Sequence, residues 1–249
     1  MKQIKKLYHK KNLKPDEIVL DIETTGLSFF SDKLVLLGII TFEDNKFYIN
    51  QFFAEYNNEE KELLKIYLKK IDNKKLFTYN GDVFDIPFLN SRLSFYGLEK
   101  IFVQNTDIYK IVTNYRKYFD FKSLKLEYIE KIIKINRDDP KRINSKSLLK
   151  SDLEKRINSF PILKHNENDL ISTEKLINIS DTFDNELSFF SKKLKSKITL
   201  KNISINKDLC FIEFFSEKKI DMFLSYDDVS VSSDNNLITL TIKVIYGKI

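Results

Sequence analysis

The chain has very few of the residues on which covalent and zinc-based scaffolds depend. Its 249 residues include one cysteine, Cys210, two histidines and no tryptophan. A single cysteine excludes an internal disulfide framework, and the lack of a cysteine pair excludes the usual structural zinc patterns. A hydrophobic content of 42% over this length is enough for a substantial core and a second, smaller domain. We therefore expect a globular protein of a reducing compartment.

Long apolar runs are also lacking. No apolar run is long enough to span a bilayer, and the basic residues 1–6 are not followed by the apolar stretch of a secretion signal. We therefore expect a cytoplasmic protein without membrane contact. The net charge of +6 permits a polyanionic partner such as nucleic acid. Lysine is far commoner than arginine, so genome base composition can explain part of this charge.

The first half of the chain predicts a mixed sheet. Apolar or alternating runs at 17–23, 33–41 and 46–53 are joined by short turns and predict three antiparallel strands. Two further strands are predicted at 75–79 and 101–104, and a helical pattern follows each of them. Alternation of strand and helix indicates parallel pairing. The result is an α/β architecture with a mixed five-stranded sheet flanked by helices, an order that resembles the RNase H-like fold.

Helical patterns account for most of the remaining residues up to 180. An amphipathic helix is predicted after the N-cap and acidic residues at 57–60, and a second helix at 86–96. Two or three helices are predicted over 108–158, with a break at Pro140, and one more over 159–180. These helices complete a first domain over residues 1–188.

The last sixty residues have a different pattern. Apolar and polar residues alternate in four segments separated by polar clusters. The segments are 198–205, 209–215, 220–225 and 237–244. They predict a small antiparallel β unit over residues 189–249. Three roles are compatible with it: an extension of a nucleic-acid track, an oligomer interface, or a cap on the first domain.

The string DIETTGL at residues 21–27 carries the first candidate site residues. Carboxylates two positions apart on a strand point to the same face, so Asp21 and Glu23 can converge on one cation while Ile22 faces the core. For an isolated pair, a strand that frays into an acidic turn is the better interpretation. The complete string after an apolar run is much rarer and favours a pair of metal ligands.

The string YNGDVFDIPFL at residues 79–89 carries the second group of candidate site residues. Asp85 follows a strand and a glycine turn and opens a helix, so we expect it to be the helix N-cap, with Pro87 in the first turn. A metal-binding role for Asp85 is compatible with this position. We expect Asp82 to be a solvated turn residue, and Asn80 is a candidate substrate-binding residue.

A third group lies on the last predicted helix of the first domain. His165 and Asp169 are four positions apart, so they share a helix face at the edge of its apolar stripe. An isolated pair with this spacing is usually a surface hydrogen bond. Asp107 follows the fifth predicted strand, and we expect it to cap the next helix rather than to bind metal, a position that is compatible with lining the site.

Considered together, Asp21, Glu23, Asp85, His165 and Asp169 resemble the motifs of the DEDD exonucleases in order and spacing. The resemblance covers about residues 17–180. Further segments narrow it to the YprB-type, ribonuclease H-like family. These segments are 105–107, 123–125, 137–139 and 165–166. Only three residues separate the histidine from the last aspartate, as in the tyrosine-type members, so His165 lies where their tyrosine would be.

The resemblance implies a metal-dependent 3′–5′ exonuclease that hydrolyses RNA or single-stranded DNA. Two Mg²⁺ or Mn²⁺ ions are implied, because hard carboxylate oxygens favour these metals. Asp21 would bridge the ions. Glu23 and Asp169 would complete the site that activates water. Asp85 would hold the second ion, and His165 would accept the proton.

Thr24 and Leu27 match superfamily positions that contact the terminal nucleotide, and turn formation and core packing are equally good alternatives for them. A different class of function is a non-catalytic nucleic-acid-binding or assembly protein that retains the fold. A third is a proofreading domain detached from a polymerase. The sequence contains no feature that identifies a protein partner.

Overall fold

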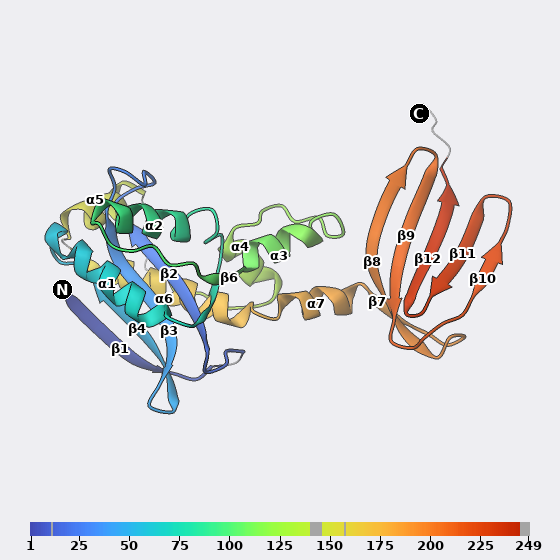
Figure 1. The fold of residues 1–249 in the computed structure, drawn as a ribbon, viewed down its shortest axis with the longest axis horizontal. Helices are drawn as coiled ribbons and strands as arrows, with labels where there is room; N and C mark the ends of the chain where they lie inside the picture. Colours follow the sequence, from blue (N-terminus) through green and yellow to red (C-terminus); the bar gives the residue numbers. More distant parts are fainter. Residues whose placement is uncertain (11, 140–145, 157, 245–249) are drawn as a thin grey trace. The chain divides into compact units, whose positions relative to one another are not determined.

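The computed structural model describes residues 1–10, 12–139, 146–156 and 158–244 (Figure 1). Pro140, where the sequence predicts a break between helices, lies outside these residues. Contacts divide the chain into two compact units, residues 1–179 and 180–249, and each unit contains its own sheet. None of the described helices is both long and apolar enough to cross a membrane.

The first unit contains a six-stranded mixed sheet with the order β1-β4-β3-β2-β5-β6. The strands are β1 (Lys2–Tyr8), β2 (Glu17–Thr24), β3 (Leu34–Glu43), β4 (Lys46–Phe53), β5 (Lys75–Thr78) and β6 (Gln104–Asp107). The strands β1 to β4 pair antiparallel, whereas β5 pairs parallel with β2 and with β6. The predicted α/β architecture with a mixed sheet is therefore confirmed.

Two details of the sheet differ from the sequence prediction. The sheet has a sixth strand, β1, which pairs with β4 along its whole length. Three of its seven residues are lysines and it is mostly exposed, as suits an edge strand, so its hydrophobic pattern is weak. Strand β6 lies three residues later than predicted, because Ile101 and Val103 pack on the core as part of the preceding loop.

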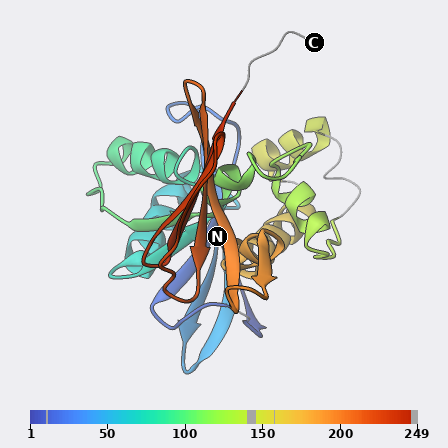
Figure 2. The same ribbon diagram turned by 90° about the vertical axis from the view of Figure 1, so that its right-hand side faces the viewer.

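Helices cover both faces of this sheet (Figure 2). They are α1 (Glu60–Ile71), preceded by the short 3₁₀ turn Asn57–Glu59, α2 (Asp85–Phe95), α3 (Ile108–Tyr115), α4 (Leu126–Ile132), α5 (Lys146–Lys155) and α6 (Ser159–Lys175). Core residues of α1 and α2 cluster on one face, and those of α6 cluster on the other. The three helices α3 to α5 confirm the helical prediction for the described part of 108–158.

The predicted helix over 159–180 is shorter than expected. Helix α6 ends at Lys175, and a separate helix, α7 (Ile179–Glu186), follows. The side-chain amide of Asn12 donates to the carbonyls of Glu174 and Lys175, at 3.0 and 3.3 Å. A side chain from the start of the chain thus satisfies carbonyl groups that are left free at a helix end.

The second unit is built on one antiparallel sheet with the order β10-β11-β12-β9-β8-β7. Its strands are β7 (Ser188–Ser191), β8 (Ser196–Asn206), β9 (Leu209–Ser216), β10 (Phe223–Ser225), β11 (Val229–Asp234) and β12 (Leu237–Lys243). This confirms the predicted antiparallel β unit. Strands β7 and β11 were not predicted, because one has only four residues and the other is rich in serine.

Candidate active site

Strand β2 places the two acids of its carboxyl end on the side of the sheet covered by α6. Alternate residues of a strand point to opposite faces. Ile22 packs in the apolar cluster shared with α1 and α2, whereas Val19 packs with Leu170 of α6. Asp21 and Glu23 lie two and four positions after Val19, so their side chains point to the same face of the sheet as Val19. They therefore face α6.

The carboxylate of Asp21 is held by Asn166, a neighbour of His165 on α6. The Asn166 amide nitrogen donates to Asp21 Oδ2 at 2.7 Å and to the Asp21 carbonyl oxygen at 3.2 Å. The Asn166 amide oxygen accepts a hydrogen bond from Gln51 Nε2 at 2.8 Å. Asn166 is fully buried, so these bonds replace the water that its amide would otherwise contact. Asn166 therefore fixes the orientation of Asp21.

A glycine makes room for this amide. In the sheet, Gly38 of β3 pairs with Asp21 of β2 on one side and with Gln51 of β4 on the other. Asn166 lies over Gly38 and bridges those two neighbours. A Cβ atom at position 38 would lie 2.1 Å from Asn166 Oδ1, far inside van der Waals contact. The glycine is required by this close approach.

Asp85 approaches β2 from the opposite face of the sheet. It is the first residue of α2, and its carboxylate accepts a hydrogen bond from the backbone N–H of Ile22 at 3.2 Å. The predicted N-cap role is wrong, because Phe84 occupies the cap position and no side chain caps the helix. Pro87 does lie in the first turn. The carboxylate of Asp85 is thus directed at the strand segment that carries Asp21 and Glu23.

Asp169 and His165 form a polar cluster with Arg137. The Arg137 guanidinium makes ion pairs with Asp169 and Asp139. It makes a third with Glu130 at 2.9 Å, and one of its nitrogens lies 2.8 Å from His165 Nδ1. His165 Nε2 is 3.7 Å from Asp169 Oδ2. His165 and Asp169 therefore lie next to each other on one face of α6, with an arginine beside both.

The four carboxylates influence one another electrostatically. Burial, followed by the charges of Asp169, Asp85 and Glu23, raises the pKa of Asp21 well above its usual value. Burial is also the main cause that raises the pKa of Glu23 to about 8 and that of Asp85 to about 7. Mutual repulsion of this kind is relieved when a cation binds among the acids.

The surroundings of His165 favour its charged form, whereas those of the four acids favour their neutral form. Burial lowers the pKa of His165, but the carboxylates of Asp139, Asp169 and Glu23 outweigh this effect and raise the pKa to about 9. The carboxylates therefore favour the protonated form of His165 in the metal-free protein, while the Arg137 guanidinium opposes it. Asp139 accepts a hydrogen bond from Asn168 at 2.7 Å, so the acid beside the histidine is itself held in place.

The donor chemistry of the site fits a hard divalent cation, since Asp21, Glu23, Asp85 and Asp169 present only carboxylate oxygens. The side chains do not close around one point: within the described part of the chain, no group of three or more His, Cys, Asp or Glu residues is placed to hold an ion. Asp169 is instead paired with the guanidinium of Arg137.

The candidate nucleotide-binding residues lie in two loops. The Thr24 hydroxyl donates to the carbonyl of Gly26 at 2.6 Å, so Thr24 stabilises the turn after β2. Leu27 in that turn is 82% exposed, which excludes core packing as its role. Asn80 follows β5 with a φ of 64°. Its backbone N–H donates to Asp107 at 2.8 Å.

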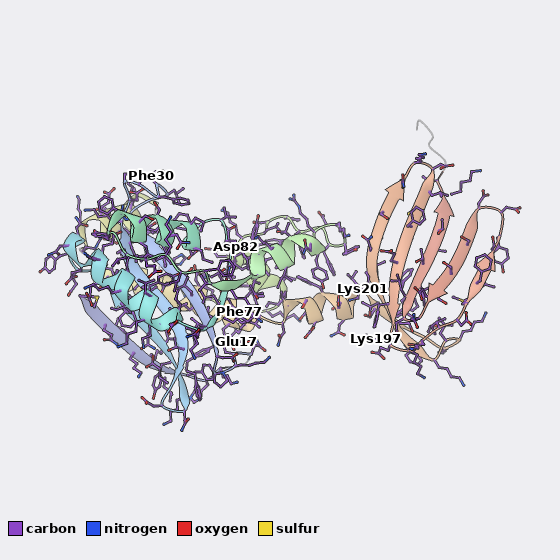
Figure 3. All side chains as sticks on the ribbon, in the orientation of Figure 1. Glu17, Phe30, Phe77, Asp82, Lys197 and Lys201 are labelled. Carbon is purple, nitrogen blue, oxygen red and sulfur yellow. The ribbon has the colours of Figure 1, made fainter. Side chains whose placement is uncertain are left out.

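Two aspartates near β5 and β6 behave differently from each other. Asp107 accepts a hydrogen bond from the Tyr109 N–H at 3.0 Å, which confirms that it caps α3. Asp82, which is labelled in Figure 3, is partly buried. Its carboxylate bonds to Lys110 and Asn105. Asp82 therefore lies in the turn, as predicted, but its carboxylate is only partly solvated, because it also contacts these two side chains.

A family model for the RNase H superfamily matches residues 18–180, more than half of the chain. The chain belongs to the RNase H superfamily. No curated protein matches it. This superfamily assignment agrees with the order of strands in the first unit and with the position of the acids on its central strand.

Several solved structures resemble this RNase H superfamily chain. The family B DNA polymerase from the archaeon Pyrobaculum calidifontis matches with a TM-score of 0.50 and 18% identity. That match covers 69% of this chain but 25% of the polymerase. NrnC from Brucella melitensis bound to pGG matches with a TM-score of 0.47 and 18% identity, over 70% of this chain and 76% of NrnC. Exonuclease I, in a complex with SSB and an inhibitor, matches with a TM-score of 0.46 and 11% identity, over 80% of this chain and 55% of that one.

The sequence did not reveal how the site is supported. Arg137 and Asn166 lie in segments that carry the family resemblance, but their contacts with Asp169 and Asp21 depend on the packing of distant segments. Gly38 lies in an apolar strand with no local sign of a special role. A glycine in the middle of a strand is the one available signal, since it often marks a close approach of another group.

Proposed function

We propose that the chain is a metal-dependent 3′–5′ exonuclease that hydrolyses RNA or single-stranded DNA. The observation that carries the proposal is the electrostatic coupling of Asp21, Glu23, Asp85 and Asp169, which come from three separate elements. Burial and mutual repulsion raise the pKa of these acids in a chain that belongs to the RNase H superfamily. Strongly perturbed carboxylates that lie together are typical of a functional site.

The four acids would hold two Mg²⁺ or Mn²⁺ ions. When bound, such ions stabilise both the attacking and the leaving oxygen of a phosphodiester. Asp21 is the acid whose pKa is raised by the charges of all three others, so it would bridge the two ions. Asn166 keeps the Asp21 carboxylate in one orientation, as this role needs. Glu23 and Asp169 would serve one ion and Asp85 the other.

His165 would accept the proton from the attacking water. In the metal-free protein its pKa is raised to about 9, because the surrounding carboxylates outweigh burial. Bound cations would neutralise Glu23 and Asp169 and so lower the pKa of His165, while the hydrogen bond with Asp139, the largest cause that raises this pKa, would remain. The lowered pKa would favour the neutral form of His165, which can take up a proton from the attacking water.

The substrate and the finer family membership rest on the sequence motifs. The motif order is that of the DEDD exonucleases, and the segments around Arg137 and His165 resemble those of the YprB-type family. We propose a nucleic-acid 3′ end as substrate, with Leu27, Thr24 and Asn80 near the terminal nucleotide. Leu27 is exposed in the loop next to the acids and is available to contact a base.

The test is release of nucleotides from labelled single-stranded RNA and DNA in the presence of Mn²⁺. The Asp21→Asn variant removes the bridging charge, and Asp16→Asn is a matched control, because Asp16 is an exposed acid that precedes the same strand. We expect release by the wild type and by Asp16→Asn but not by Asp21→Asn. Circular substrates should resist, since they have no 3′ end. Equal release by all three proteins would contradict the proposal.

A second candidate is a nucleic-acid-binding protein without activity. One observation favours it: Arg137 forms an ion pair with Asp169, one of the four acids. Binding of labelled RNA or DNA by the wild type, with no nucleotide release over a range of Mg²⁺ and Mn²⁺ concentrations, would select this function instead.

A further inference from the structure

The sheet of the second unit has one face that is almost entirely apolar. Residues that pair directly across antiparallel strands point to the same face. One such row runs across five strands, from Leu224 through Val231, Leu240 and Ile212 to Ile203. All five side chains are aliphatic, although each comes from a different strand.

The rows on either side continue this apolar face. They are Val229, Ile242, Cys210 and Ile205 on one side, and Ser233, Ile238, Phe214 and Leu200 on the other. Seven of these eight residues are hydrophobic. We call the surface formed by the three rows the apolar face.

A β-bulge in β8 keeps this face continuous. Leu200 and Ile203 are three residues apart, so they would point to opposite faces of a regular strand. The register shifts between Leu200 and Asn202, and the extra residue brings Ile203 and Ile205 back to the face of Leu200. The sequence thus adds one residue at the place where the apolar pattern would otherwise move to the other side.

The paired charged residues of the sheet lie on the opposite face. Glu213 pairs with Thr239 and Lys243 pairs with Leu209, in register positions that alternate with those of the apolar face. Lys197, which alternates with Ile198 along β8, lies on the same side as Glu213. A face whose paired residues carry no charge does not suit a polyanion, because phosphate contacts need lysine or arginine.

The apolar face is accessible in part. Ile205 is 60% exposed, and Ile203 and Leu224 are each 42% exposed. Figure 1 draws β8, β9, β12 and β11 as a single layer, with no described helix of this unit across it. With a strand spacing of about 4.8 Å and a rise of about 3.4 Å per residue, the whole side of the six-stranded sheet that contains the apolar face, β7 included, presents roughly 600 Å². This is at the upper limit for an apolar patch on a monomer.

We propose that the apolar face is a homodimer interface, on which the same face of a second copy of this chain packs. Two such faces would bury roughly 1,200 Å² in total, the lower end of the range of stable interfaces. Two sheets packed face to face form a sandwich with an interior about 10 Å thick. On one side the edge strand β10 has three residues, whereas on the other β7 pairs only with residues 196–199 of β8, so residues 201–206 of β8 have no described strand on that side.

The experiment measures the mass of the full-length protein by sedimentation equilibrium over a range of concentrations. Ile205→Lys places a charge in the apolar face, and Ser204→Lys is its matched control, because Ser204 is the adjacent exposed residue on the other face. We expect the wild type and Ser204→Lys to form dimers. Ile205→Lys should raise the dimer dissociation constant by about 100-fold or more, since each interface would bury two unpaired charges.

Cys210 gives a second readout that needs no change in the interface. It is the single thiol of the chain and lies in the apolar face. We expect its reaction with a maleimide to slow as the protein concentration rises. In Cys210→Ala/Ser232→Cys the single thiol is on the other face, where the rate should not depend on concentration.

A wild type that stays monomeric, or that labels at Cys210 at a rate independent of concentration, would overturn the proposal. So would equal dissociation constants for the two lysine variants, or growth into larger oligomers, which indicates a head-to-tail contact. If Ile205→Lys does not fold, as judged by circular dichroism, the labelling of the wild type decides. The apolar face contains none of the proposed catalytic residues, so this result is independent of the nuclease assay.

Discussion

The close contact between Gly38 and Asn166 leads to a sharp prediction about the support of Asp21. In Gly38→Ala the new Cβ would lie 2.1 Å from Asn166 Oδ1 and 2.6 Å from Nδ2. The amide of Asn166 must then move away from the sheet. Its hydrogen bonds to Asp21 Oδ2 at 2.7 Å and from Gln51 at 2.8 Å are lost together.

The magnitude follows from these two bonds. Breaking a buried hydrogen bond and leaving its partner unsatisfied costs about 1–3 kcal/mol. Replacing glycine by alanine also lowers the conformational entropy of the unfolded chain, which stabilises the folded state by about 0.5 kcal/mol. We therefore expect Gly38→Ala to lower the free energy of unfolding by about 3 kcal/mol, which for a unit of this size shifts the melting temperature by about 6–12 °C. The φ of Gly38 is not in the left-handed region, so backbone strain does not contribute.

A double-mutant cycle isolates the contact. In Asn166→Ala the amide is absent, so adding Gly38→Ala should cost nothing or stabilise slightly. The coupling between the two positions is then about 3 kcal/mol, far above the value for independent sites. Thermal unfolding of the four proteins, followed by circular dichroism, measures it. Equal effects of Gly38→Ala in both backgrounds would contradict this explanation, and so would an unchanged melting temperature in the single variant.

Three further predictions concern buried charges. Because the pKa of Glu23 is raised to about 8, mainly by burial, the folded protein holds this proton more tightly than the unfolded chain does. The stability that this group contributes is present at low pH and is lost between about pH 4.5 and 8. In thermal unfolding with a chelator, the melting temperature should fall less over this range for Glu23→Gln than for the wild type. An equal fall in both proteins would count against the assignment. Arg137→Gln removes the ion pair of the buried Glu130 and should cost about 3 kcal/mol in urea unfolding, whereas a loss below about 1 kcal/mol would mean that the pair behaves as an exposed one. Arg92→Met leaves Glu60 without its ion pair at 2.7 Å and should cost about 3–5 kcal/mol; Arg92→Met/Glu60→Gln should recover part of this loss, and a double variant less stable than the single one would exclude an uncompensated charge as the cause.

Much of the fold could be predicted because it depends on local patterns. Runs of alternating or continuous apolar residues defined the strands β2 to β5, and the turn and cap residues between them set the change from antiparallel to parallel pairing. Predictions failed where the local signal was weak. Strand β1 is rich in lysine, β7 has only four residues, and β11 is rich in serine. Such strands are stabilised by pairing with a neighbour and not by their own composition.

Local periodicity was sufficient to place Asp21 and Glu23 on one face, because the period of a strand is two residues, and local turn chemistry identified Asp107 as the cap of α3. The surroundings of these acids depend on tertiary packing. Asp85 bonds to the backbone of Ile22, 63 positions away, and Asn166 reaches Asp21 across 145 positions. Contacts over such separations require α2 and α6 to pack on opposite faces of the sheet. The periodicity of a strand or helix shows which face a residue occupies, but it contains no information about which distant side chain will contact that residue.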